Sequence, residues 1–260
     1  MVTFARQAYF LYKGLFMWLN WPAYVSSMIL RPGFMVAIFG LTGRFARGEE
    51  AGEAYMIGMT AFAIPHILMG GILQNFAYER SFGTLGLVFA SSGSRLLSFL
   101  SRGVLHYPNA MMTVVASLFF AGIILSTDFN GADWGAVAVT YALIGVSCTL
   151  FGLFLGNFSI AMRDWQVSFN ITQAAFMALT GAVIPRSALP AGLYELSGLL
   201  PVTHGLEGLR AAFAGAGIAT IGDELMLEAL IGVAYAVAGY GLYRLVEAYA
   251  RRSGAYEMTR

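Results

Sequence analysis

The chain has 260 residues, of which 58% are hydrophobic and 11% charged, and its formal net charge is +1. Soluble domains carry about 25% charged residues, so this chain has too few to cover a globule in water, and we expect lipid to surround much of it. The small net charge argues against a nucleic-acid partner. One cysteine excludes an internal disulfide framework, and no Cys/His zinc spacing is present.

The first predicted element is residues 4–20, an aromatic segment that contains Arg6 and Lys13. It is too polar to span a membrane and suits an amphipathic helix that lies in the cytoplasmic headgroup plane. It lacks the apolar core and cleavage site of a secretory signal peptide.

Six later segments are long and apolar enough to span a bilayer, which takes about 20 residues. Arg31 and Pro32 fall inside the first span, where proline is tolerated with a kink and arginine reaches the headgroups with its long side chain. Glu228 lies near one end of the sixth span, and we count it with the acids outside the membrane. We expect one all-α membrane domain over residues 1–260, with spans at residues 24–43, 55–77, 104–125, 135–158, 166–184 and 225–249.

The basic residues that flank the spans predict the orientation. With both termini in the cytoplasm, ten basic residues fall on inner segments and four on outer ones, and Arg31 is left within the first span. Cytoplasmic segments of membrane proteins carry the excess of lysine and arginine. We therefore expect both termini inside.

Two connections are more than simple loops. Glu79 and Arg80 end the uncharged run 54–78, and the inner segment that follows is long enough for a short helix and a turn. The outer segment 185–223 is apolar, but Pro190 and Pro201 divide it into pieces too short to cross. This pattern predicts short re-entrant helices that dip into the outer leaflet and return.

Three stretches carry a family resemblance: ERSFGTL at 79–85, AMRD at 161–164, and TGAVIP, LP and LPVTHGLEGLR at 180–185, 189–190 and 200–210. They resemble the permease subunits of type-two ABC exporters, a family of drug, lipo-oligosaccharide and polysaccharide exporters. Two positions depart from the family pattern. Gly86 stands where many members carry another acid, and Thr180 stands where serine is more usual.

The resemblance implies a second membrane subunit, either a copy or a paralogue, and a cytoplasmic ATPase bound to each. It implies a bacterial cytoplasmic (inner) membrane as the location. A Walker A loop ends in Gly-Lys-Ser/Thr, whereas the only lysine here, Lys13, precedes Gly14 and Leu15. We therefore expect no cofactor bound directly and no enzyme activity of this chain, with ATP and Mg held by the partner ATPase.

The resemblance also suggests site residues. Glu79 and Arg80 are expected to couple to the ATPase and to stay solvated until they bind it, or else only to mark the membrane edge. The proposed ATPase-coupling element comprises Glu79, Arg80, Gly83 and Thr84. Arg163 and Asp164 are either an ion-pair hinge at the inner gate or a boundary pair.

The remaining candidates lie in the outer segment and in the spans. His204, Glu207 and Arg210 share a helix face, which favours local ion pairing over a substrate contact. The external hairpin would comprise Pro185, Pro190, Pro201, His204, Glu207 and Arg210. His66 is either functional or a neutral imidazole bonded to a carbonyl freed by Pro65. With Asn170 and Gln173 it is a candidate for the translocation path or the dimer wall.

These patterns favour a subunit that exports an amphiphilic drug or lipid-like molecule from the cytoplasm or inner leaflet. Export of polysaccharide or lipid-linked glycan by the same architecture is the alternative. A secondary transporter is a distant alternative, because it usually needs charged residues at mid-membrane. A membrane-embedded enzyme would need clustered carboxylates or histidines at one depth, which the sequence does not offer.

Overall fold

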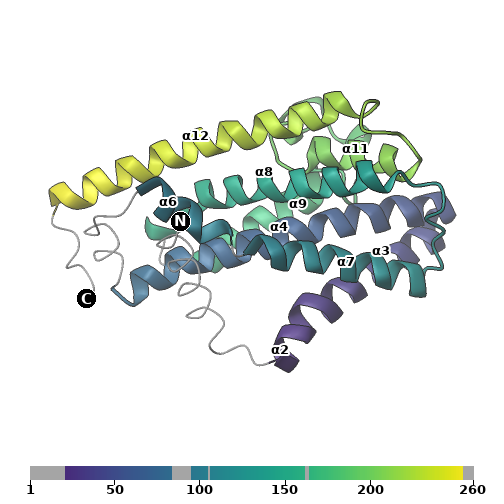
Figure 1. The fold of residues 1–260 in the computed structure, drawn as a ribbon, viewed down its shortest axis with the longest axis horizontal. Coiled ribbons are helices and arrows are strands. Elements are labelled where there is room, and N and C mark those ends of the chain that lie inside the picture. Colours follow the sequence, from purple (N-terminus) through teal and green to yellow (C-terminus); the bar gives the residue numbers. More distant parts are fainter. Residues whose placement is uncertain (1–20, 84–94, 105, 162–163, 254–260) are drawn as a thin grey trace.

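A computed structural model describes residues 21–83, 95–104, 106–161 and 164–253. All regular elements in these ranges are helices, and the longer ones lie side by side along the long axis of the molecule (Figure 1). The predicted interfacial helix at 4–20 lies outside the described residues. The elements are α2 (Trp21–Val25), η1, a π-helical turn (Ser26–Leu30), α3 (Arg31–Arg47), α4 (Glu49–Ser81), α6 (Arg95–Val104), α7 (His106–Ile124), α8 (Trp134–Ala161), α9 (Trp165–Leu179), η2, a 3₁₀ turn (Arg186–Ala188), α10 (Ala191–Ser197), α11 (Thr203–Phe213) and α12 (Gly222–Ser253).

Five described helical stretches are long and apolar enough to cross a membrane: Trp21–Arg47, Glu49–Glu79, Phe99–Ile124, Trp134–Phe158 and Gly222–Ala248. They correspond to the first, second, third, fourth and sixth predicted spans. The fifth, predicted at 166–184, is shorter than expected because its helix α9 ends at Leu179. Its 15 residues rise about 22 Å, less than the roughly 30 Å of hydrocarbon. Gly181, with φ of 88°, turns the chain just after the helix.

The first span is one continuous helical rod despite its proline. The π turn η1 directly precedes Arg31 and Pro32, and Pro32 has no N–H with which to bond the preceding turn. Thr113 on α7 donates its hydroxyl to the Met28 carbonyl at 3.0 Å. A neighbouring helix thus satisfies a backbone group near the proline, which is how spanning helices tolerate this residue.

Helix α4 is the centre of the bundle, and it packs against α3, α7, α8 and α9. Most of its membrane stretch is buried inside the protein. Small residues permit close packing here, since a Cβ at Gly58 would overlap the backbone of Ala182 and one at Gly156 would overlap the Phe76 ring. The central position of α4 carries Glu79 and His66 into the interior of the protein.

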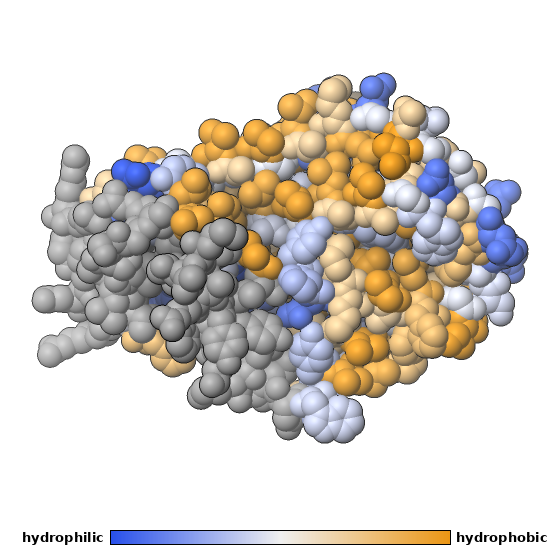
Figure 2. Space-filling model, viewed as in Figure 1, coloured by the Kyte–Doolittle hydropathy of each residue, from blue (hydrophilic) through white to orange (hydrophobic). Residues whose placement is uncertain are grey.

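Helix α12 lies on the outside of the bundle and packs on α8 and α11. Its outward face is apolar, and Figure 2 shows hydrophobic residues covering the visible side of the molecule around it. Leu230, Val233, Val237 and Leu245 are all more than half exposed. A soluble protein would not expose such a continuous apolar face, so this surface suits contact with lipid.

Candidate functional site

Glu79, near the end of α4, forms a buried ion pair with Arg102 on α6. The Arg102 Nη2 and Nε atoms lie 2.8 and 3.2 Å from Glu79 Oε2. Only 1% of the Arg102 side chain and 9% of the Glu79 side chain are exposed. A buried charge is costly unless it is paired and hydrogen-bonded, so each residue needs the other to stay in place.

Aromatic and amide groups complete this cluster. The Arg102 guanidinium lies over the rings of Phe76 on α4 and Tyr243 on α12, 4.9 and 5.8 Å from their centroids. Asn75 donates to the Arg102 carbonyl at 3.2 Å, and its amide nitrogen lies 2.9 Å from His106 Nε2 on α7. The cluster therefore joins α4, α6, α7 and α12 at the end of the bundle where the coupling element was predicted. We call Asn75, Phe76, Glu79, Arg102 and Tyr243 the inner cluster.

The predicted coupling residues are only partly accessible. The expectation that Glu79 stays solvated is wrong, because Arg102 covers its carboxylate. Gly83 is exposed and has φ of 67°, so the chain turns there in a conformation that favours glycine. The side chain of Arg80 and all of Thr84 lie outside the described residues. Sequence reasoning missed Arg102, which it had counted only as an inner basic residue.

Asp164, predicted at the inner gate, caps a helix. Its side chain accepts a hydrogen bond from the Gln166 backbone N–H at 2.8 Å, at the start of α9. This is the ordinary role of an aspartate at such a position. Its predicted partner, Arg163, lies outside the described residues, so the ion-pair hinge stays a prediction.

The external hairpin forms ion pairs, with a different partner from the one expected. Glu207 pairs with Arg186, which also donates to the Ser197 hydroxyl at 2.9 Å. His204 Nδ1 lies 3.9 Å from Glu207. Arg210 instead donates to the Gly181 carbonyl at 2.6 Å. These contacts hold α11 against the turn that follows α9.

Pro185, Pro190 and Pro201 each lie before a short helix or turn in the segment between α9 and α12. Pro185 precedes the turn η2, and Pro190 immediately precedes α10. Pro201 lies in the turn before α11. Neither α10 nor α11 is long enough to span, with 7 and 11 residues.

Glu228 belongs to α12, and its side chain is buried against the first turn of α11. The sequence had suggested a position outside the membrane. Its carboxylate accepts from the backbone N–H groups of Val202 and Gly205 at 2.9 and 3.0 Å, and from the Ser147 hydroxyl on α8. A helix N-terminus has unsatisfied N–H groups and favours negative charge. Glu228 of α12 therefore caps α11 and ties both helices to α8.

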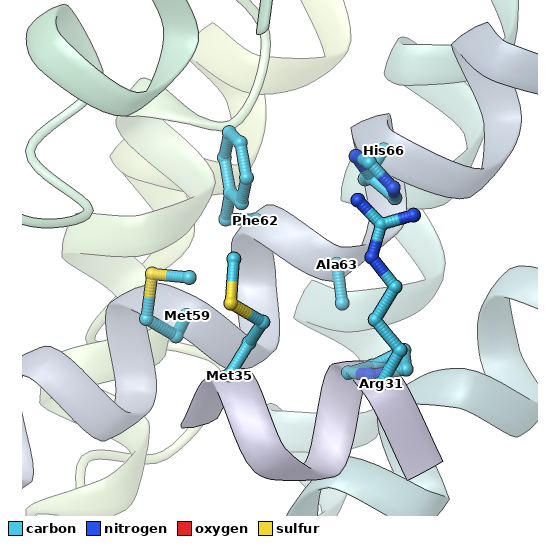
Figure 3. Close-up of a pocket in the computed structure, with 7 residues that line it drawn as sticks. Arg31, Met35, Met59, Phe62, Ala63 and His66 are labelled. Atoms are coloured by element: carbon cyan, nitrogen blue, oxygen red, sulfur yellow. The ribbon is translucent and has the colours of Figure 1, made fainter. Parts of the chain in front are cut away.

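A cavity of about 380 Å³ opens between the first span, α4, α7 and α9. Its polar lining includes Arg31, Ser26, His66, Gln74 and His106. A smaller, apolar pocket adjoins it and shares Arg31 and His66 (Figure 3). The two pockets thus meet at these two side chains.

The three predicted path residues do not all meet. His66 lines the cavity, and its ring lies between Phe62 and Phe169, with centroids 6.4 and 5.4 Å away. Gln173 is buried and donates to the carbonyl of Pro65 at 3.3 Å. Asn170 is exposed on α9. Within the described ranges, no group of three His, Cys, Asp or Glu residues could hold a metal.

Comparison with models of known protein families gives a match over most of the chain. The family described as ABC-2 type transporter matches residues 7–214, most of the chain. No curated protein matches the chain.

Proposed function

Because the chain belongs to the ABC-2 type transporter family, as its transmembrane subunit, we propose that it exports an amphiphilic drug or lipid-like molecule from the cytoplasm or inner leaflet. The family's membrane domain lacks the ATPase, so this chain is not catalytic itself. Its members function with ABC ATPase subunits. The proposed ATPase binds the cytoplasmic end of the bundle, in a bacterial inner membrane with both termini inside.

The inner cluster is the observation that carries this proposal. The segment after Glu79 joins α4 to α6, and the Glu79–Arg102 pair holds the end of α4 against the last turn of α6. Tyr243 extends the contact to α12. If the ATPase displaced this segment, α4, α6 and α12 would therefore move together, and the movement would not be confined to the loop. In this proposal the ATPase contacts Arg80, Gly83, Thr84 and the residues that follow. Glu79 does not touch the ATPase but transmits the movement to α6 through its ion pair with Arg102.

The shape of the cavity supports an amphiphilic cargo. The larger cavity, which carries the polar side chains of Ser26 and Gln74, and a small apolar pocket of about 40 Å³ meet at Arg31 and His66. A molecule with a polar head and an apolar body finds both kinds of contact there. The short helix α9, with the segment after it, would complete a sixth crossing. Helices α10 and α11 would form the re-entrant outer hairpin.

Reconstitution with the cognate ATPase tests this function. Liposomes that contain both proteins should expel an amphiphilic dye only when ATP is present, and vanadate should stop the export. The same liposomes loaded with a long polysaccharide should retain it. Dye export by the purified chain without ATPase or nucleotide would overturn the proposal.

The exposed face of α9 is the proposed dimer wall. Val167 and Ile171 are 53% and 66% exposed, and Asn170 lies beside them. Residues three and four apart share one helix face, so the three form a patch with Val167 in the middle and Asn170 at one edge. A second membrane subunit packed here would cover its apolar side chains and bond its amide.

Substitution of Ile171 by Cys tests this wall. The native Cys148 is buried, so we expect it to react little with maleimide. A short bifunctional maleimide should link two Ile171→Cys chains in membranes. Val237→Cys is the control, since it is 70% exposed on α12. Equal or preferential linking through Val237→Cys would contradict the assignment.

A further inference from the structure

Arg31 is a cation in a candidate membrane span, and no residue in the described part of the chain pairs with its guanidinium. It lies in the spanning stretch Trp21–Arg47, and its guanidinium takes part in no ion pair or hydrogen bond in the described part of the chain. Of the residues that the structure does not describe, 1–20, 84–94, 105 and 162–163 contain no acidic residue, and 254–260 contain Glu257. Arg31 is exposed, and at about 25 Å from the Gly48 turn it lies near the other edge of the roughly 30 Å hydrocarbon layer, where a long side chain reaches polar groups. Because no described carboxylate pairs with it, its guanidinium is open to an anion from outside the chain.

Arg31 and His66 lie opposite each other at one depth. Each is about 25 Å along its helix from the α3–α4 turn at Gly48. Figure 3 shows the Arg31 guanidinium pointing toward the His66 ring across the pocket. Two helices thus present one fixed cation and one imidazole to the same space.

The larger cavity on one side of this pair has several polar side chains in a mainly apolar lining, and the pocket on the other side is almost wholly apolar. Ser26, Gln74 and Trp165 line the larger cavity, farther than Arg31 from the Gly48 turn along the bundle. The adjoining pocket, nearer to that turn, is lined by Met35, Met59 and Phe62. Figure 2 shows a narrow band of hydrophilic residues near α2, next to apolar residues on one side.

No carboxylate lines either pocket in the described part of the chain, so an anion meets attraction without repulsion. We propose that Arg31 and His66 bind the anionic head of an amphiphile, a phosphate or carboxylate, whose apolar chain starts against Met35, Met59 and Phe62. Their pocket of about 40 Å³ takes only the first methylenes of that chain, and the rest extends toward the lipid. This inference rests on the proposed function, because it specifies the class of molecule at the proposed cargo site. With both termini inside, the head faces the cytoplasm and the chain faces the bilayer centre, as in an inner-leaflet lipid. Arginine suits this role since its planar fork binds both oxygens of such a head.

Trp165 provides a direct reporter, because it lines the same cavity. The full chain, with its other tryptophans Trp18, Trp21 and Trp134 replaced by Phe, is placed in nanodiscs. Its fluorescence is then titrated with phosphatidylglycerol or phosphatidylcholine brominated near the head of the acyl chain. Phosphatidylglycerol should quench Trp165 at about ten-fold lower mole fraction, as a charge-assisted contact predicts.

The variants locate the effect. Arg31→Gln should abolish the preference for phosphatidylglycerol, and Arg31→Lys should keep part of it because the charge remains. Arg47→Gln is the matched control, since it removes a charge from the last turn of the same helix. Equal quenching of the Arg31-containing chain by the two lipids, or a preference that survives Arg31→Gln, overturns the proposal. The first of these outcomes needs no Arg31 or Arg47 variant and so does not depend on how they fold.

A second arm separates the two sources of the anion and the two proposals. In liposomes with the ATPase, Arg31→Gln should slow export of an anionic amphiphile and spare a neutral one if the bound molecule is cargo. It should change both equally if the site holds a resident lipid. Export without the Trp165 preference leaves the transport function standing and rejects the anion site. A Trp165 preference for phosphatidylglycerol without any ATP-driven export would support the anion site and reject the transport function.

Discussion

Replacement of Glu79 by Ala should destabilise the protein by about 3–5 kcal/mol, because it leaves the Arg102 guanidinium buried without its carboxylate. Unfolding in mixed micelles measures this free energy. Glu49→Ala is the matched control, since Glu49 pairs with Arg44 at the α3–α4 turn but is 74% exposed. Its loss should cost below about 1 kcal/mol, as exposed ion pairs do. If the two substitutions lowered the free energy of unfolding by the same amount, the Glu79–Arg102 pair would contribute no more than an exposed ion pair, which would contradict this prediction.

The double variant Glu79→Leu with Arg102→Leu separates stability from coupling. Replacement of a buried pair by apolar residues is often neutral, so most of the lost stability should return. ATP-driven export should nevertheless fall about ten-fold, because changes within a coupling network typically alter coupling by about 0.5–2 kcal/mol. Full export by a stable double variant would mean that the inner cluster holds the fold without transmitting motion.

Glu228→Ala should be the second severe substitution. It removes the acceptor for two backbone N–H groups and one hydroxyl, and each buried group left unsatisfied costs about 1–3 kcal/mol. We expect a loss of several kcal/mol and faster proteolysis of the outer segment between α9 and α11. Thermal unfolding in micelles and limited digestion from the outer face measure the two effects.

Asp223→Asn is the control for Glu228, because Asp223 is exposed in the first turn of the same helix. It should change stability little. Glu228→Gln is the informative intermediate, since it keeps the size but turns one acceptor oxygen into a donor that faces another N–H. A Glu228→Gln protein as stable as the parent would contradict the capping role.

Five of the six predicted spans have a matching long apolar helix, because the length of a run without charges is set by the thickness of the bilayer. The end of α9 was not predictable, since it depends on a left-handed Gly181 and on Arg210, which bonds the Gly181 carbonyl from 29 residues away. No local pattern contains that contact. The segment after it was still divided correctly, because proline acts on its own neighbours.

The site residues were predictable by type more than by role. A run-length argument treats an acid near the end of a span as a boundary marker, and Glu228 fits that description in the sequence. Its partners Ser147 and Val202 lie 81 and 26 residues away, so only the folded chain shows the cap. Glu79 was recognised as a candidate because it is the first charged residue after the uncharged run 54–78. Its partner Arg102 lies 23 residues further on, so the sequence did not reveal the pair. A family pattern marks a residue without saying whether it faces water or another helix.

The π turn η1 has a mechanical consequence for the first span. A π turn holds more residues than an α turn, so rewinding it to α geometry would shift the helical register by one residue. Helix α2, on its N-terminal side, would then rotate by about 100° and advance about 1.5 Å relative to Arg31. The Thr113 hydroxyl lies 3.0 Å from the Met28 carbonyl and 2.9 Å from the Asn109 carbonyl of its own helix, and it opposes this rotation when it donates to Met28.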